Sequence, residues 1–338
     1  MRVGARPRLM AAAVATVALA ASASAATRPL VVGTAMPAKH EATLAAQQFA
    51  EKLAESAAGI KVEHHHSGSL GSERDLLRAV QAGSLDLTPL PTAALAALVP
   101  ELGVFQLPYL FRDYPHLFAA LDGDVVRPHY ATLLERKGLR FVAFFVAGYR
   151  ALYGTITVST PEELRGKPIR VQDDRATIAT FAALGMIPLP IPVPEVTTAF
   201  RSATVALAEG GLPTYQRARQ FEVAKYVADL RHVHEVVVFV MAKSSWARLD
   251  AAGRRAVTEA ARLAEQGNRQ LVAEQDRSIQ DQLRAKGAVI NTPDPAPFRA
   301  AVRGLWEELF ATPAGRDARR IVDHVLALAT SAGAGVRP

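Results

Sequence analysis

The sequence predicts an α/β protein that is divided into two lobes. Strand-like apolar runs alternate with segments of helical periodicity, and this alternation is typical of α/β folds with largely parallel sheets. The 338 residues exceed what one ordinary core needs and are enough for two domains. One proline-free stretch, residues 250–287, is long enough to serve two lobes rather than a single core.

The first predicted elements alternate strictly between strand and helix. Leu44, Phe49 and Leu53 recur at helical spacing. Ser72 suits the N-cap of a short helix and Gly83 its C-terminal stop. The predicted order is strand 30–35, helix 41–59, strand 60–66, helix 72–83 and strand 85–90.

The later predicted strands are continuous apolar runs, which suit strands that are buried on both faces. Asp250 is a good N-cap for the long helix and Gly287 a good stop, while Gly267 allows the helix to run through or to bend. The predicted strands are 139–147, 167–171, 204–209 and 235–242, and the shorter helices are 175–185 and 193–202.

The first 26 residues have the layout of a secretory signal peptide. Three arginines precede an apolar stretch at residues 9–21, and small residues at 23–25 suit cleavage. No later stretch has the roughly 20 apolar residues that a membrane span needs. We therefore expect residues 1–26 to be removed and the mature protein to be exported, soluble and periplasmic.

Composition argues against several classes of function. The formal net charge of +7 falls to +4 without the three signal-peptide arginines, and no dense basic run remains, so nucleic-acid binding has little support. The chain has no cysteine, which removes disulfides, thiol nucleophiles and cysteine-based zinc sites. It has no Gly-x-Ser-x-Gly, P-loop or His-Glu-x-x-His motif, so we expect no enzyme and assign no cofactor.

Histidines supply an alternative chemistry. His64, His65 and His66 are consecutive, and successive side chains of a strand point to opposite faces, so a polar strand end is favoured over a shared metal. His232 and His234 share a face if their segment is a strand, but no neighbouring Asp or His cluster completes a set of ligands. A periplasmic zinc-binding protein therefore stays as a second hypothesis, with no metal site assigned.

Two arginines follow strand-like runs, where the ligand clefts of open α/β sheets tend to lie. Arg150 ends an apolar run, and Arg170 alternates with Ile169 and Val171, so it takes the opposite face of its strand. A pair of guanidinium groups suits a carboxylate, because the planar fork makes two parallel charge-assisted hydrogen bonds. The pattern alone leaves a solvated strand end as the alternative for each arginine.

Six segments in order match the motifs of one known family. They are GSLGSERDLLRAVQAGSLDL at 68–87, LPYLFRDYPH at 107–116, GYR at 148–150, TPEELRGKPIRV at 160–171, ALGMIPLPIPVPEVTTAF at 183–200 and VAKYVADLRHVHEVVVFVMAKSSWARL at 223–249. With these segments the chain resembles the periplasmic substrate-binding proteins of tripartite ATP-independent periplasmic (TRAP) transporters, of the dicarboxylate-binding type. The resemblance covers nearly all of the mature chain.

The resemblance implies a two-lobed periplasmic-binding-protein fold with hinge strands and a long interlobe helix. Lobe 1 would comprise residues 27–147 and about 236–270, and lobe 2 residues 148–235 and about 271–330, followed by a flexible tail at 331–338. It also implies a monomer that captures a small carboxylate between its lobes and delivers it to the membrane subunits of a TRAP transporter. The ligand-binding component of a sensor is the alternative.

The resemblance also assigns roles to individual residues. Arg170 matches the arginine that pairs with the ligand carboxylate, and Arg150 matches the arginine that assists it. Glu73 matches a position that contacts the distal part of the ligand, and His40 lies in a loop that faces the pocket.

Two departures from the family pattern leave more room in the expected pocket. Glu209 is retained from a Gly-Val-Val-Asp-Gly-x-Glu-Asn-Pro motif, but Gly210 stands where the family commonly has a ligand-binding asparagine. Val193 stands where an aromatic residue is common. A grip on the ligand carboxylate is still expected, while the identity of the ligand and its distal contacts stay open.

Overall fold

The structure is a computed structural model that describes residues 28–311 and 313–332. The predicted signal peptide therefore lies outside the described residues. The strands are β1 (Leu30–Gly33), β2 (Val62–His65), β3 (Leu87–Pro91), β4 (Leu139–Gly154), β5 (Pro168–Val171), β6 (Ile187–Pro190), β7 (Leu207–Gly211), β8 (Tyr226–Ala242) and β9 (Val289–Asn291).

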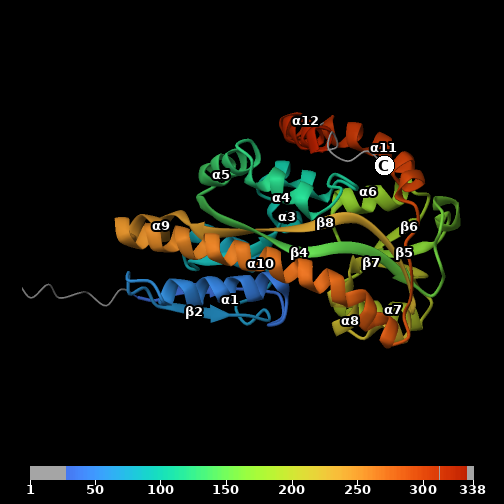
Figure 1. Ribbon diagram of the computed structural model, residues 1–338, viewed down its shortest axis with the longest axis horizontal. Coiled ribbons are helices and arrows are strands. Elements are labelled where there is room, and N and C mark those ends of the chain that lie inside the picture. The colour runs from blue at the N-terminus through green and yellow to red at the C-terminus, as the bar shows by residue number, and fades with distance from the viewer. Residues whose placement is uncertain (1–27, 312, 333–338) are drawn as a thin grey trace, which may run out of the picture.

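Helices surround these strands on both sides (Figure 1). The α-helices are α1 (Glu41–Ala54), α2 (Glu73–Ala82), α3 (Thr92–Leu95), α4 (Tyr114–Asp122), α5 (Val126–Arg136), α6 (Arg175–Ala183), α7 (Val196–Arg201), α8 (Leu212–Arg217), α9 (Lys243–Arg248), α10 (Ala251–Ala285), α11 (Pro295–Phe310) and α12 (Pro313–Ala332). The 3₁₀-helices are η1 (Pro100–Gln106), η2 (Pro161–Leu164), η3 (Val193–Glu195) and η4 (Gln220–Glu222).

The described strands form one mixed sheet in the order β2-β1-β3-β8-β4-β7-β5-β6, with β9 paired to β8. The outer pairs β1–β2, β1–β3, β5–β6, β5–β7 and β8–β9 are parallel, as predicted. The central pairs β3–β8, β4–β8 and β4–β7 are antiparallel, so the expectation of a largely parallel sheet was wrong at its centre. The α/β class and the two-lobed architecture are confirmed.

The strands β4 and β8 run through both lobes (Figure 1). The apolar run 139–147 predicted the first half of β4, and the run 235–242 predicted the second half of β8. The other halves carry polar residues such as Arg150 and Asp229, which interrupt the apolar pattern. Periodicity therefore located the lobe 1 portions of both strands and missed their continuation.

Irregular pairing marks the place where these two strands pass between the lobes. In β4 the register shifts between Val146 and Tyr149, where Gly148 has φ +97°, a conformation that favours glycine. In β8 the residues 229–232 lie opposite Ala151 alone. Bulges of this kind bend a strand and redirect its side chains, so this segment is a natural hinge.

The long helix α10 is continuous, as the sequence predicted. Asp250 caps its N-terminus by accepting a hydrogen bond from the backbone N–H of Gly253 at 2.7 Å. The helix runs through Gly267 without interruption. A Cβ atom at Gly267 would lie 2.1 Å from the side-chain amide of Gln48, so Gln48 of α1 occupies the space that a larger residue at this position would use.

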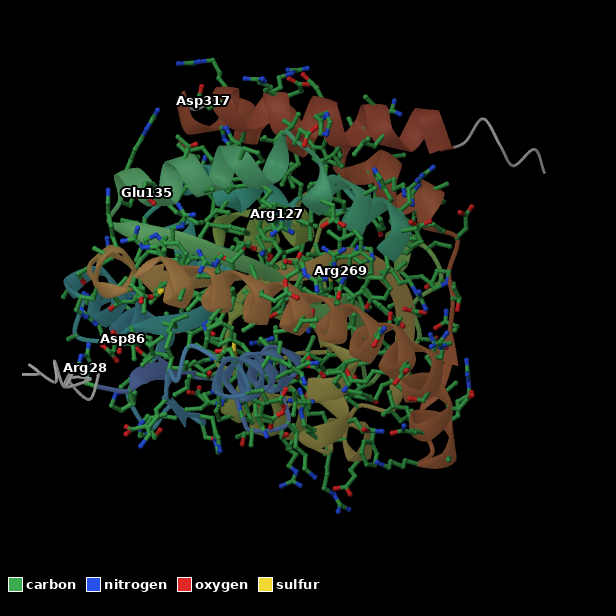
Figure 2. All side chains as sticks on the ribbon, turned by 60° about the vertical axis from the view of Figure 1, so that its left-hand side comes forward. Arg28, Asp86, Arg127, Glu135, Arg269 and Asp317 are labelled. Carbon is green, nitrogen blue, oxygen red and sulfur yellow. The ribbon has the colours of Figure 1, made fainter. Side chains whose placement is uncertain are left out.

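Polar contacts fasten α10 to the first lobe. Asn268 exchanges two hydrogen bonds, of 2.7 and 3.0 Å, with the backbone of Val146, and so satisfies groups that the bulge in β4 leaves unpaired. Nearby, Arg127 of α5 donates to Glu265 of α10 at 2.6 Å, and Arg269 of α10 donates to Asp122 of α4 at 2.6 and 2.7 Å (both arginines are labelled in Figure 2). The first part of α10 is therefore fastened to lobe 1, while Ile279 and Leu283 near its end belong to the apolar cluster of lobe 2.

The C-terminal helix α12 also packs on the first lobe. Its buried residues Ile321, Val322 and Val325 belong to the same apolar cluster as Phe105 of η1 and Phe144 of β4. The predicted lobe boundaries remain a prediction, but this packing places α12 with lobe 1, whereas the sequence assigned residues up to 330 to lobe 2.

The predicted tail at 331–338 lies mostly outside the described residues. Its first two residues are the exception, because they continue α12 to Ala332 and are helical. Within the described part of the chain, none of the helices combines the length and the apolar character that crossing a membrane requires.

Candidate ligand-binding site

Arg170 is a buried cation without a carboxylate partner in the described part of the chain. It lies on β5 with 3% of its surface exposed, and its Nε and Nη1 donate to the backbone oxygens of Ile191 and Glu209 at 2.7 and 3.0 Å. Among the described residues no carboxylate lies within 4.0 Å of its guanidinium, and its Nη2 makes no hydrogen bond. Burial lowers the pKa of Arg170, because the charged form loses hydration. A bound anion would supply both the missing charge and the missing acceptors.

Arg150, in contrast, is fully engaged. Its Nε and Nη2 donate to Glu209 at 2.5 and 2.7 Å, and its Nη1 donates to Glu235 at 3.2 Å. The amide oxygen of Gln172, in the orientation that satisfies both groups, accepts from Nη1 and Nη2 at 2.6 and 3.1 Å. Although burial opposes its charge, the two glutamates raise the pKa of Arg150. Direct contact between Arg150 and a ligand stays a prediction, and the geometry favours a positioning role.

Glu209 connects the two arginines. Its carboxylate holds Arg150, and its backbone oxygen accepts from Arg170. Burial alone would raise its pKa, but Arg150 and His232 outweigh that effect and hold the pKa of Glu209 well below its usual range. We infer that Glu209 stays ionised and fixes the frame around Arg170 rather than meeting an anionic ligand.

Lobe 1 contributes His40 and Glu73, and the charge of Glu235 on β8 acts to raise the pKa of both. His40 is the N-cap of α1, and its Nδ1 accepts the backbone N–H of Ala42 at 3.2 Å, so the neutral ring carries its proton on Nε2. Burial lowers the pKa of His40 and keeps the ring neutral. Glu73 begins α2 behind the capping residue Ser72, and burial, helped by Glu235, raises its pKa to about 7.

We expect Glu73 to contribute stability to the ligand-free protein that is lost as the pH rises from about 4.5 to about 7. The pKa of its carboxyl rises from 4.5 to about 7 in the folded protein, so this group keeps its proton in the folded state at pH values where it loses it in the unfolded chain. Through Glu73, raising the pH therefore favours unfolding. Urea unfolding of the wild type and of Glu73→Gln across this window isolates the effect, because the amide does not titrate. An identical pH slope in both proteins would contradict it.

The structure brings Arg150, Arg170, Glu209 and Gly210 together on the neighbouring strands β4, β5 and β7. His40 and Glu73 lie in lobe 1, and their contact with the same ligand stays a prediction. Two residues that the sequence analysis missed also contact Arg150. The missed residues are Glu235 and Gln172. A signal for Glu235 was present, since it is the charged residue that opens the apolar run 235–242. Gln172 carried no comparable signal, because polar residues at strand ends are common.

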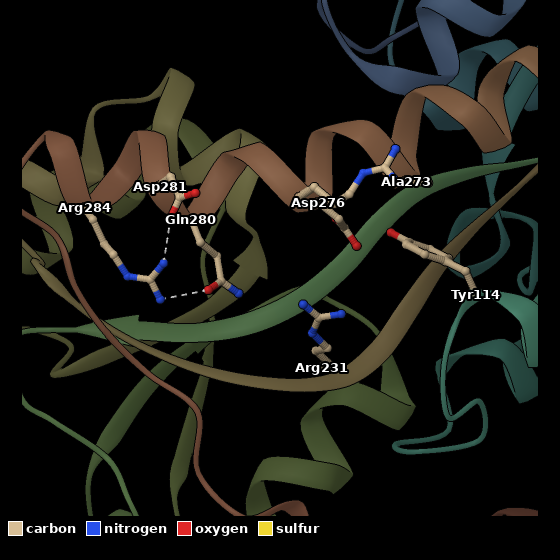
Figure 3. Close-up of a pocket in the computed structure, with 8 residues that line it drawn as sticks. Tyr114, Arg231, Ala273, Asp276, Gln280, Asp281 and Arg284 are labelled. Atoms are coloured by element: carbon tan, nitrogen blue, oxygen red, sulfur yellow. Dashed lines mark hydrogen bonds and ion pairs between the residues drawn. The ribbon is translucent and has the colours of Figure 1, made fainter. Parts of the chain in front are cut away.

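A separate cavity of about 380 Å³ lies between α10, α4 and the bulge of β8, and it contains neither arginine of the site (Figure 3). It is lined by Tyr114, Arg231, Ala273, Asp276, Arg277, Gln280, Asp281 and Arg284. In Figure 3 the side chain of Asp276 points toward the hydroxyl of Tyr114. Burial raises the pKa of Asp276 to about 6. The lining contains three arginines and two aspartates, and Arg284 already pairs with Asp281 at 3.0 Å. Arg170 differs from these arginines in being buried without a carboxylate partner among the described residues.

The histidines considered as metal ligands have other neighbours. His64 lies 3.0 Å from the hydroxyl of Thr34, His232 packs against the ring of Phe181, and His234 packs against Phe111 and Tyr114. Within residues 28–311 and 313–332, no group of three or more His, Cys, Asp or Glu residues is arranged to hold a metal ion.

The chain has two lobes that share the strands β4 and β8, and its second lobe holds a buried arginine without a carboxylate partner among the described residues. These features are those of two-lobed solute-binding proteins. The chain belongs to the bacterial extracellular solute-binding proteins of family 7, whose profile matches residues 32–312. The resemblance to the solute-binding proteins of TRAP transporters is thereby confirmed.

Several relatives support the assignment. The chain is 30% identical over 287 residues to the 2,3-diketo-L-gulonate-binding periplasmic protein YiaO of Escherichia coli, covering 83% of this chain and 87% of that protein. A TRAP periplasmic solute binding protein of Xanthobacter autotrophicus, solved with β-D-galacturonate, is 29% identical with a TM-score of 0.79, covering 87% and 99% of the two chains. One of Roseobacter denitrificans, solved with β-D-glucuronate, is 29% identical with a TM-score of 0.81, covering 88% and 98%.

Proposed function

We propose that this TRAP solute-binding protein captures a sugar acid with a single carboxylate. The observation that carries the proposal is Arg170, a buried guanidinium with free donors and no anionic partner among the described residues. A ligand carboxylate would form charge-assisted hydrogen bonds there, and such bonds are about twice as strong as neutral ones. The sugar acids bound by the solved relatives support the same chemistry.

The remainder of the site favours hydroxyl groups over a second carboxylate. Glu73 and Glu235 offer acceptors for hydroxyl donors, and His40 offers a neutral Nε2–H donor. A dicarboxylate would bring its second negative charge against Glu235, which costs free energy in a partly dehydrated cleft. The dicarboxylate type of the family therefore describes the fold of this chain better than its ligand.

Ligand capture is proposed to work by stabilising the closed arrangement of the lobes. Arg170 and Arg150 belong to lobe 2, whereas His40 and Glu73 belong to lobe 1, so a ligand that touches both sets favours closure. Arg217 of α8 already reaches across to lobe 1, where it donates to the backbone oxygen of Lys39 at 3.2 Å. The hinge bulges let this motion occur without breaking either core.

We expect D-galacturonate or D-glucuronate to raise the melting temperature and succinate to raise it less. At a ligand concentration a hundred times Kd, mass action adds about 2.7 kcal/mol of stability. Glu235→Gln should reduce the difference between the melting-temperature shifts that the sugar acid and succinate cause, since it removes the charge that repels the second carboxylate. Thermal-shift measurements followed by calorimetry test both points. A wild type that prefers succinate would overturn the proposed specificity.

Export and delivery complete the proposed role. Residues 1–26 would direct the chain to the periplasm, where it would act as a monomeric binding protein rather than an enzyme and pass its ligand to the membrane subunits of a TRAP transporter. Membership in the family supports this partner over the sensor and zinc alternatives.

A further inference from the structure

Tyr153 carries a hydroxyl that no described residue satisfies, although the residue is only 3% exposed. The ring packs against Tyr215 at 4.5 Å and against Phe200 at 6.2 Å, and these contacts account for its apolar part. Its neighbour Tyr215 shows the usual alternative for a buried phenol, because its hydroxyl donates to the backbone oxygen of Ala224 at 2.6 Å.

The free hydroxyl lies directly beside Gly210. A Cβ atom placed on Gly210 would be 3.2 Å from the Tyr153 oxygen, which is closer than most real Cβ contacts. Gly210 does not have the positive φ that would require glycine for backbone reasons. The phenol therefore occupies the space that a side chain at position 210 would otherwise use.

The same hydroxyl belongs to the face of the sheet that carries Arg170. Arg170 pairs with Ala208 across β5 and β7, and Ala208 pairs with Tyr153 across β7 and β4, so the three side chains stand in one row. Burial raises the pKa of Tyr153 to about 12, and the positive charge of Arg170 opposes this rise, so the phenol keeps its proton at neutral pH. It is therefore available as a hydrogen-bond donor.

We propose that Tyr153 is a further ligand-contacting residue, whose hydroxyl donates to the carboxylate held by Arg170 on the side where Gly210 has no side chain. The inference rests on the proposed function of Arg170. Free donors of the guanidinium would meet one carboxylate oxygen and the phenol would meet the other, so each oxygen has its own partner. The Tyr153 hydroxyl is not among the fully buried atoms without a partner, so it keeps accessible surface from which a carboxylate can reach it.

Tyr153→Phe tests the proposal, with D-galacturonate and D-glucuronate as probes in isothermal titration calorimetry. Because the variant loses a hydrogen bond to a charged group, we expect it to bind the probes at least about tenfold more weakly than the wild type. The urea midpoint of the ligand-free variant should be unchanged, because none of the described residues bonds to the hydroxyl. Tyr215→Phe is the matched control, since it loses a core hydrogen bond and should lose stability while keeping its affinity.

Gly210→Ala provides an independent test of the same contact. Its new Cβ pushes the hydroxyl aside, so affinity should fall in the wild-type background but not further in Tyr153→Phe, where the nearest ring carbons are 3.5 and 3.8 Å away. If the losses of affinity in Gly210→Ala and Tyr153→Phe added up in the double variant, the inference would be overturned. An unchanged affinity of Tyr153→Phe for a probe that the wild type binds would also overturn it. If the wild type binds neither probe, the proposed function fails and this inference fails with it.

Discussion

Replacing Arg170 with alanine is expected to weaken sugar-acid binding at least about thirtyfold while the protein still folds. Removing one partner of a buried charge pair costs roughly 2 to 5 kcal/mol, and about 1.4 kcal/mol corresponds to a factor of ten. The ligand-free protein should keep or gain stability, because Arg170 is a buried cation with no carboxylate among the described residues. Loss of binding without loss of stability is the signature of a residue reserved for a ligand.

Calorimetry with D-galacturonate and D-glucuronate measures this effect, and urea unfolding of the same preparations measures stability. Arg170→Lys should remain impaired, because an ammonium cannot reproduce the planar fork. Arg255→Ala is the matched control, since this arginine is exposed on α10. Unchanged affinity in Arg170→Ala would remove the arginine from the site.

Replacing Glu209 with alanine should have the opposite signature and destabilise the fold by about 3 to 5 kcal/mol. Glu209 has no exposed surface and neutralises Arg150, so its removal leaves the guanidinium with only Glu235 and Gln172. The shift should be visible as a lower urea midpoint in the absence of any ligand. Weaker binding would follow as a consequence of the distorted frame around Arg170.

The double variant Arg150→Met/Glu209→Leu distinguishes a lost ion pair from simple loss of packing. Replacing both charges with apolar groups of similar volume is often neutral, because it also removes two desolvation costs. The double variant should therefore recover much of the stability that Glu209→Ala loses. A double variant that is less stable than the single variant would show that the pair contributes net stability.

The predictions for Arg170→Ala and Glu209→Ala assign different roles to two arginines that the sequence did not distinguish. Arg150 and Arg170 each follow a strand-like run, and both were nominated for the carboxylate. Their difference depends on β7, which brings the carboxylate of Glu209 to one and only its backbone oxygen to the other. Position along a strand predicts which face a side chain takes, but not which charges the neighbouring strands contribute.

The sequence by itself determined the local elements and the family of this protein. Helical spacing, the caps at Ser72 and Asp250 and the stop at Gly83 are properties of neighbouring residues, and the structure has them as predicted. Motifs in order then identified a TRAP solute-binding protein, and they nominated Arg170 without any knowledge of its surroundings.

The tertiary structure decided what depends on contacts between distant segments. It extended β4 and β8 across the hinge, where Arg150, Asp229 and Arg231 interrupt the apolar pattern along each strand. It also left Arg170 uncompensated, supplied Glu235 and placed the Tyr153 hydroxyl beside Gly210. The charges that compensate a buried group come from several neighbouring strands. The order of residues along one strand does not show which of these charges will lie beside it.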